Sequence, residues 1–278
     1  MSVPVIANWI RYLMNINKIN FIKLFKEQKK LSSSKIIPSS AWDSKAAYMN
    51  KRVKHSIYNK AFISKMNFED SDTLLDFGCG TGNISIPIAN KFTNIYAIDY
   101  SKGMIDTYLN NAKEDNLSNV SAYVKTMDED WEDIPKCDIV IASRSINGAN
   151  DIEDALVKLN SYAKKRVYLT FKTYFSFFDK KLYDAIGRDK TPAPDYIYII
   201  NILYSLGIHA CVDFIPAETK YQSDITFDKF LDMVVWELGK LDEDELVKLK
   251  IYFDKEVKNK EDKHAYWALI SWKNTHRA

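Results

Sequence analysis

The residues best suited to chemistry lie in a glycine-rich loop and at the end of the strand that follows it. Residues 74–83 read LLDFGCGTGN, with glycines at positions 78, 80 and 82. Glycine lets the backbone turn tightly and approach a ligand closely, and a helix predicted to begin near Ile84 would direct unpaired N–H groups at the loop. Farther on, the apolar run IYAID ends at Asp99, whose carboxylate can accept both hydroxyl protons of a ribose. This segment predicts a nucleotide site.

The spacing of the glycines distinguishes two classes of ligand. A dinucleotide fingerprint has glycines at its first, third and sixth positions, but the sixth position counted from Gly78 is Asn83. Asp76 also lies two residues before Gly78, inside the end of the strand. A carboxylate there would repel a pyrophosphate and would suit a ligand that carries an ammonium group.

These residues, together with the run DYSKGMI at 99–105, resemble the class I S-adenosylmethionine-dependent methyltransferases. The resemblance covers roughly residues 70–172, and the rest follows by topology alone. It implies S-adenosylmethionine as the cofactor. The residues implied to contact its methionine part are Asp76, Gly78, Cys79 and Gly80, and Asp99 is implied to bind the ribose.

The same resemblance gives candidate contacts to the rest of the cofactor. Tyr100 and Met104 are expected to flank the adenine, although Met104 fits the buried face of the next helix equally well. Family members place an acid after the third strand, and of the three acids in the run MDEDW at 127–131 we favour Asp128. Trp131 is a candidate adenine wall, with packing against the sheet as the alternative. Ser143 is expected near the methionine end.

Candidate acceptor-binding residues lie at the same edge of the predicted sheet. Arg144 offers a planar fork for a carboxylate or phosphate, and a salt bridge to an acid of a later insert is the alternative. Lys172 and Tyr174 follow the fifth strand. Tyr48, on a leading helix, is a candidate wall of the pocket, with core packing as the alternative. No residue stands out as a general base.

From residue 73 onward, strand and helix patterns alternate, which predicts an α/β fold with a doubly wound, seven-stranded, mostly parallel sheet. The final strand is expected to run antiparallel. The predicted strands are 73–77, 95–99, 120–127, 138–143, 166–171, 208–215 and 264–272. The predicted helices between them are 84–90, 102–114, 152–163 and 195–206.

We expect two parts in the chain. Residues 1–66 have helical apolar spacing and form an amino-terminal helical cap, and residues 67–278 form the methyltransferase domain. A helical insert at 217–263 separates the last two strands. Its two predicted amphipathic helices, 226–238 and 242–257, together with the cap could form a lid over the carboxyl ends of the strands.

Composition limits the function classes. The chain has 278 residues and 46% apolar residues, enough for one sizeable core. No run approaches the length of a membrane span, so we expect a cytoplasmic protein that does not enter membranes. The three cysteines are widely spaced, as expected of reduced thiols, and the four histidines have no metal-ligand spacing, so no metal is predicted.

The charge is distributed unevenly along the chain. The net charge is +2, yet residues 1–60 carry +10 and the remainder −8. A basic segment can bind an anionic partner such as RNA, or its lysines can be solvated helix faces that dock onto the acidic body.

Three functions follow from these observations. The first is a methyltransferase that acts on a small molecule, with an anionic acceptor as one form. The second is an RNA methyltransferase that uses the basic segment. The third is a noncatalytic cofactor-binding protein with the same fold.

Overall fold

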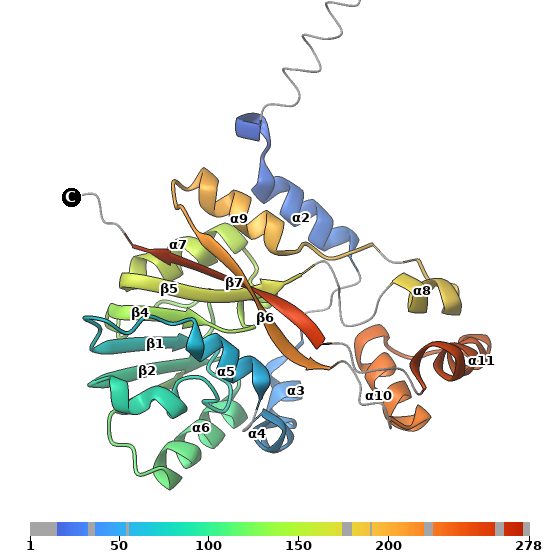
Figure 1. Ribbon diagram of the computed structural model, residues 1–278, viewed down its shortest axis with the longest axis horizontal. Coiled ribbons are helices and arrows are strands. Elements are labelled where there is room, and N and C mark those ends of the chain that lie inside the picture. Colours follow the sequence, from blue (N-terminus) through green and yellow to red (C-terminus); the bar gives the residue numbers. More distant parts are fainter. Residues whose placement is uncertain are drawn as a thin grey trace, which may run out of the picture.

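A seven-stranded sheet forms the centre of the computed structural model, which describes residues 16–32, 37–53, 56–173, 180–189, 191–219, 225–258 and 264–274 (Figure 1). The strand order is β3-β2-β1-β4-β5-β7-β6. The strands are β1 (Thr73–Phe77), β2 (Asn94–Asp99), β3 (Val120–Val124), β4 (Cys137–Ala142), β5 (Ala163–Lys172), β6 (Cys211–Thr219) and β7 (His264–Lys273).

Pairing in the sheet follows the predicted pattern. β1 pairs in parallel with β2 and with β4, so that Leu74 lies between Ile95 and Ile139. β7 is antiparallel to both of its neighbours, β5 and β6. The doubly wound fold, with its antiparallel last strand, is therefore confirmed.

Side chains alternate between the two faces of the sheet. Leu74 and Ile139 belong to one apolar layer, whereas Leu75 and Val140 belong to the other. All four are completely buried, as expected for strands covered on both faces. The first layer is covered by α5 (Ile57–Ser64) and the second by α7 (Ile152–Tyr162) and α9 (Tyr196–Ser205).

Several predicted strand boundaries are wrong. β5 begins at Ala163, before the predicted residue 166, and β6 ends at Thr219, beyond the predicted residue 215 and inside the predicted insert. β3 ends at Val124 instead of continuing to residue 127. β6 begins at Cys211 because the preceding helix ends in a turn, in which the N–H of Ile208 donates to the carbonyl of Leu203.

The helix predicted at 84–90 is also different. The chain turns at residues 79–85 and then forms a 3-10 helix, η2 (Ile86–Lys91). Pro87 lies in the first turn of η2 and has no N–H to donate. The expected array of α-helical N–H groups is therefore absent here, and the loop itself presents its backbone to the site.

The segment before β1 covers the carboxyl edge of the sheet from two sides. α2 (Phe21–Leu31) packs against α9, and α3 (Ser39–Asp43) and α4 (Ala46–Val53) pack against α6 (Lys102–Glu114) (Figure 1).

A small helical cluster lies beside the sheet with an apolar core of its own. The insert contributes α10 (Phe227–Leu238) and α11 (Glu243–Tyr252), close to the predicted bounds, and a π-helix, η4 (Phe253–Val257). An unpredicted helix, α8 (Lys180–Ile186), completes the cluster. None of these helices contributes a described residue to the lining of the cavity below.

Candidate functional site

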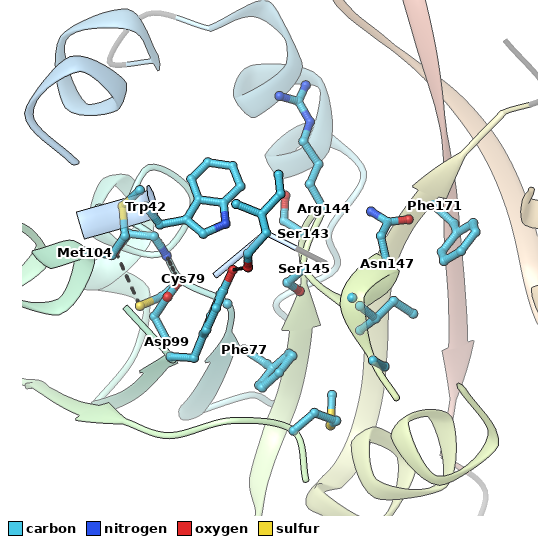
Figure 2. A pocket seen from close by; sticks show the side chains of 18 of the residues that line it. Trp42, Phe77, Cys79, Asp99, Met104, Ser143, Arg144, Ser145, Asn147 and Phe171 are labelled. Atoms are coloured by element: carbon cyan, nitrogen blue, oxygen red, sulfur yellow. Dashed lines mark hydrogen bonds between the residues drawn. The ribbon is translucent and has the colours of Figure 1, made fainter. Parts of the chain in front are cut away.

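A cavity of about 570 Å³ lies at the carboxyl ends of β1, β2 and β4. Its floor is the glycine loop and the ends of these strands, and its roof comes from α2 and residues 37–49 (Figure 2). Eleven of the predicted site residues line it: Asp76, Gly78, Cys79, Gly80, Asp99, Tyr100, Met104, Asp128, Ser143, Arg144 and Lys172.

The glycine loop adopts a conformation that other residues rarely take. Gly78 and Gly80 have φ angles of +66° and +54°. A Cβ on Gly78 would lie 2.1 Å from the Cβ of Ser145, whereas a Cβ on Gly80 would meet no atom within 4 Å. Gly78 therefore permits close packing of the loop against the end of β4, and Gly80 leaves its side of the loop open to a ligand.

Asp76 is a buried carboxylate with one unpartnered oxygen. Its side chain is 2% exposed, and Oδ2 has no hydrogen-bond partner. The pKa of Asp76 is raised to about 7, chiefly by burial; the Ser85 hydrogen bond lowers it, and the nearby Asp99 carboxylate contributes to the rise. The Ser85 hydroxyl lies 3.1 Å from the hydroxyl of buried Tyr108. Ser85 therefore uses part of the acceptor capacity of the carboxyl, and Oδ2 remains for a cation.

Asp99 fixes the glycine loop and keeps further acceptor capacity. Its Oδ2 accepts a hydrogen bond of 2.9 Å from the Gly80 N–H, and its Oδ1 accepts one of 2.9 Å from the Ser101 N–H. Burial raises the pKa of this carboxyl, and these backbone donors oppose the rise. An ionised carboxylate has about four acceptor sites, and the backbone of Gly80, Tyr100 and Ser101 uses three, so Asp99 keeps capacity to accept a ribose hydroxyl proton.

Asp43, which the sequence did not single out, ties the roof to the helix that follows Asp99. Its Oδ1 accepts from the Ser101 hydroxyl at 2.6 Å and from the Gly103 N–H at 2.8 Å. The hydrogen bond from Ser101 lowers the pKa of Asp43. The Tyr100 hydroxyl adds a bond of 3.0 Å to the carbonyl of Ile37.

Trp131 is not a wall of the cavity. Its side chain is fully buried, its ring centroid lies 5.2 Å from that of Phe77, and its Nε1 donates to the carbonyl of Thr126. This bond turns the indole into the layer beneath the sheet, so the packing alternative holds. Thr126 and Met127 line the cavity instead.

Tyr48 is also away from the cavity. Helix α4 turns Ala46 and Asn50 toward the body of the protein, and Asn50 exchanges hydrogen bonds with Asn111 on α6. Tyr48, between them in sequence, points outward and is 61% exposed. The aromatic residue of this region that lines the cavity is Trp42. The predicted contact at Tyr174 lies outside the described residues.

Arg144 lies in a strained turn at the end of β4. Its φ is +58°, and its N–H donates to the Thr170 hydroxyl, which lies 2.6 Å from the Tyr58 hydroxyl. The guanidinium carbon lies 3.4 Å from the centre of the Tyr58 ring, and Nη2 lies 3.7 Å from Glu218. Figure 2 shows the side chain extending away from Ser145 and Asn147. The ion pair with Glu218, which was predicted to lie in the insert and belongs to β6, is present at a distance longer than a hydrogen bond, and Arg144 Nε and Nη2 have no hydrogen-bond partner.

Two cavity residues at the end of β4 were missed by sequence reasoning. Ser145 Oγ and Asn147 Oδ1 are buried, and neither has a hydrogen-bond partner. Ser145 lies against Gly78, and the Ser143 hydroxyl beside it contacts that of Tyr58 at 2.8 Å. Unpartnered polar atoms in a cavity are available to a ligand.

Comparisons with known proteins agree with this geometry. A family model described as a methyltransferase domain matches residues 68–191. An uncharacterized protein of Haemophilus influenzae is 36% identical over 264 residues, which is 93% of this chain and 98% of that protein. The chain belongs to the class I S-adenosylmethionine-dependent methyltransferase family. Its cofactor is accordingly S-adenosylmethionine.

Two further proteins are similar to this methyltransferase, one over part of the sequence and the other in fold. A probable cobalt-precorrin-6B C(15)-methyltransferase of Methanococcus vannielii is 33% identical over 98 residues, or 35% of this chain and 52% of that protein. A solved structure of a putative methyltransferase of Haloferax volcanii, in complex with a methyltransferase activator, has a TM-score of 0.56 at 15% identity. That match covers 86% of this chain and 97% of the other.

The cavity fits the chemical groups of the cofactor. Asp76 Oδ2 offers an unpartnered acceptor for an ammonium group, and Asp99 retains lone pairs for ribose hydroxyls. The described residues contain no group of His, Cys, Asp and Glu side chains able to hold a metal ion. They also contain no helix long and apolar enough to cross a membrane.

Proposed function

We propose that this methyltransferase transfers the methyl group of S-adenosylmethionine to a small-molecule acceptor inside the cavity. The observation that carries the proposal is the roof. α2 and residues 37–49 lie over the carboxyl edge, so that Asp76 and Asp99 share one roofed cavity with Phe25 and Phe171. A roofed cavity of about 570 Å³ has the size of a small-molecule site.

The cofactor occupies the part of the cavity nearest β1 and β2 in this proposal. Asp76 binds the ammonium group, the backbone at Gly78, Cys79 and Gly80 faces the methionine part, and Ser143 lies beside its end. Asp99 binds the ribose. Tyr100, Met104 and Asp128 surround the adenine, and all three line the cavity.

Positioning supplies most of the rate enhancement. The sulfonium of the cofactor makes its methyl group an electrophile with a neutral leaving group. The protein must therefore hold the acceptor in line with the methyl and exclude water. Such alignment can contribute about 7–11 kcal/mol to lowering the barrier. The cap contributes by enclosing the acceptor, through contacts such as Phe25 against Phe171 at a centroid distance of 6.3 Å.

The contacts of α2 favour a lid over an RNA-binding arm. Lys26 forms an ion pair of 2.5 Å with Asp151, and Lys29 donates to the carbonyl of Ala149 at 2.5 Å. Both lysines are directed at the body of the protein, which is the docking role predicted as an alternative for the basic segment. Lysines that bind the phosphates of RNA would need to face solvent.

The proposal is tested by incubating the protein with cofactor labelled in its methyl group and with a cell extract. We expect label in the small-molecule fraction. Label in RNA would favour the RNA methyltransferase instead. Cofactor binding without transfer to any fraction would favour a noncatalytic protein.

A further inference from the structure

The guanidinium group of Arg144 carries two donors without partners. Nε and Nη2 are buried, and neither has a hydrogen-bond partner among the described residues. They are adjacent donors on one edge of the guanidinium plane, and such an edge matches the two oxygens of a carboxylate or phosphate. A buried charged donor without a partner is costly in free energy. An anion that pairs with this edge removes that cost.

The backbone and two aromatic rings place Arg144 at the cavity. Its strained φ of +58° and the hydrogen bond from its N–H to the Thr170 hydroxyl fix where the side chain begins. The guanidinium carbon lies 3.4 Å from the centre of the Tyr58 ring and 5.1 Å from that of Trp267. Such contacts leave the N–H groups at the edge to other partners. Arg144 and Tyr58 both line the cavity, and the Arg144 side chain is 31% exposed.

Glu218 balances the charge of Arg144 without occupying its donors. The distance from Nη2 to Glu218 Oε2 is 3.7 Å, longer than a hydrogen bond, and Glu218 Oε1 has no partner among the described residues. Burial raises the pKa of Glu218, but Ser56, nearby backbone N–H groups and Arg144 together bring it below its usual value. Glu218 therefore stays ionised with support besides Arg144, and the guanidinium can turn from it toward an anion in the cavity.

We propose that Arg144 binds a carboxylate or phosphate group of the methyl acceptor, exchanging its long contact with Glu218 for a bidentate pair with that anion. The inference rests on the proposed function and names its substrate class, a small organic anion. Ser145 lies against Gly78, in the loop that faces the methionine part of the cofactor in that proposal. The Arg144 side chain extends away from Ser145 (Figure 2). The guanidinium is therefore directed away from the cofactor and serves the acceptor.

Simple probes can test this role without knowledge of the natural acceptor. The full-length protein is saturated with S-adenosylhomocysteine and titrated with benzoate, phenyl phosphate, neutral benzamide and cationic benzylamine, with binding followed by ligand-observed NMR. At least one anionic probe should bind more tightly than both the neutral and the cationic probe. Arg144→Gln should weaken binding of that anion roughly 10-fold or more, the size expected for the loss of charge-assisted hydrogen bonds. An equal preference for benzamide, or unchanged anion binding in Arg144→Gln, would overturn the proposal.

Two further variants separate anion binding from a structural ion pair. Glu218→Gln should strengthen binding of the anionic probe, because the carboxylate that competes for Arg144 is removed. Arg144→Lys keeps the positive charge but loses the two parallel donors, so its affinity for the anion should lie between those of the wild type and Arg144→Gln. Unchanged or weaker anion binding in Glu218→Gln would contradict the exchange of partners.

Arg166→Gln is the matched control. Arg166 lies on β5, and its Nη1 donates to the carbonyl of Glu69 and to the Ser71 hydroxyl. None of these three is among the described residues that line the cavity. This variant should bind every probe as the wild type does. A loss of anion binding as large as that in Arg144→Gln would show that overall charge attracts the probes, and the proposal would fail.

Titrations of S-adenosylhomocysteine itself separate this inference from the proposed function. Cofactor affinity should be the same in the wild type, Arg144→Gln and Arg144→Lys, which also shows that the variants fold. If both variants instead lose cofactor affinity as strongly as probe affinity, Arg144 binds the carboxylate of the cofactor and the proposal is wrong. If the wild type does not bind S-adenosylhomocysteine at all, the proposed function fails first.

Discussion

At the scale of single residues, the Asp76 carboxyl has the greatest consequence for binding. One of its oxygens is unpartnered, and burial raises its pKa to about 7. A bound ammonium group favours the ionised carboxylate and lowers that pKa, so binding must release the proton that the free carboxyl carries below pH 7. Affinity for the cofactor therefore depends on pH through this one group.

We predict that affinity for S-adenosylhomocysteine falls as pH decreases below about 7, approaching tenfold per pH unit. Ser85→Ala should move the onset of the fall to higher pH, because the Ser85 hydrogen bond lowers the pKa of Asp76. Calorimetric titrations at several pH values measure both effects. Asp76→Asn is the control and should bind weakly with a flat profile. The same slope in Asp76→Asn would show that another group titrates.

Asp99 gives a second prediction at this scale. Asp99→Ala should weaken cofactor binding roughly 10-fold to 150-fold, since charge-assisted hydrogen bonds to a ribose contribute about 1.5–3 kcal/mol. The loop should also loosen, because Asp99 accepts the Gly80 N–H. Fluorescence titration gives the affinity, and circular dichroism checks that the fold persists. An unchanged titration curve would refute the ribose contact.

At the scale of elements, two glycines of the loop have different roles: one serves cofactor binding and the other serves stability. Gly80→Val should abolish cofactor binding, because its Cβ would project into the open side of the loop and its φ of +54° disfavours a branched residue. Gly82→Ala should instead lower stability, because its Cβ would lie 2.4 Å from Ile86 Cδ1. Urea denaturation and cofactor titration of both variants distinguish these roles. Normal binding by Gly80→Val would exclude the loop as the cofactor site.

The elements also show what sequence could predict. Strand patterns and the glycine spacing are local, so the amino-acid sequence alone places Asp76 and Asp99 at adjacent strand ends. Asp43 and Lys29 depend on how the leading helices dock, and no local pattern marks such positions. Trp131 was ambiguous because an aromatic after a strand fits either a ligand or the core, and here the Thr126 carbonyl directs it to the core. Pro87 was a local signal against an α-helix and was overlooked.

At the scale of the whole molecule, the leading segment provides a roof over the carboxyl edge of the sheet. Asp43 ties this segment to α6, and Lys26 ties it to the start of α7. The positive charge of residues 1–60 and the negative charge of the rest of the chain thus neutralise each other in part. The helical cluster of α8, α10 and α11 has a separate core and contributes no described residue to the cavity.

Deletion of residues 1–40 tests the role of the leading segment. We expect lower turnover or faster loss of cofactor, because Phe25 and the rest of α2 no longer enclose the cavity. The salt dependence of cofactor binding should change little. Binding assays with RNA at several salt concentrations provide the comparison. Tight, salt-sensitive RNA binding that disappears with the deletion would overturn the small-molecule proposal.

The most direct test of the central claim, that the cavity binds S-adenosylmethionine through Asp76 and Asp99, is one set of calorimetric titrations at about pH 8 with three ligands. S-adenosylhomocysteine should bind at least 10-fold more tightly than 5′-methylthioadenosine, which lacks the ammonium group that Asp76 would hold. NAD should bind far more weakly than either, because Asp76 repels a pyrophosphate. Equal affinity for the first two ligands, or preference for NAD, would contradict the claim.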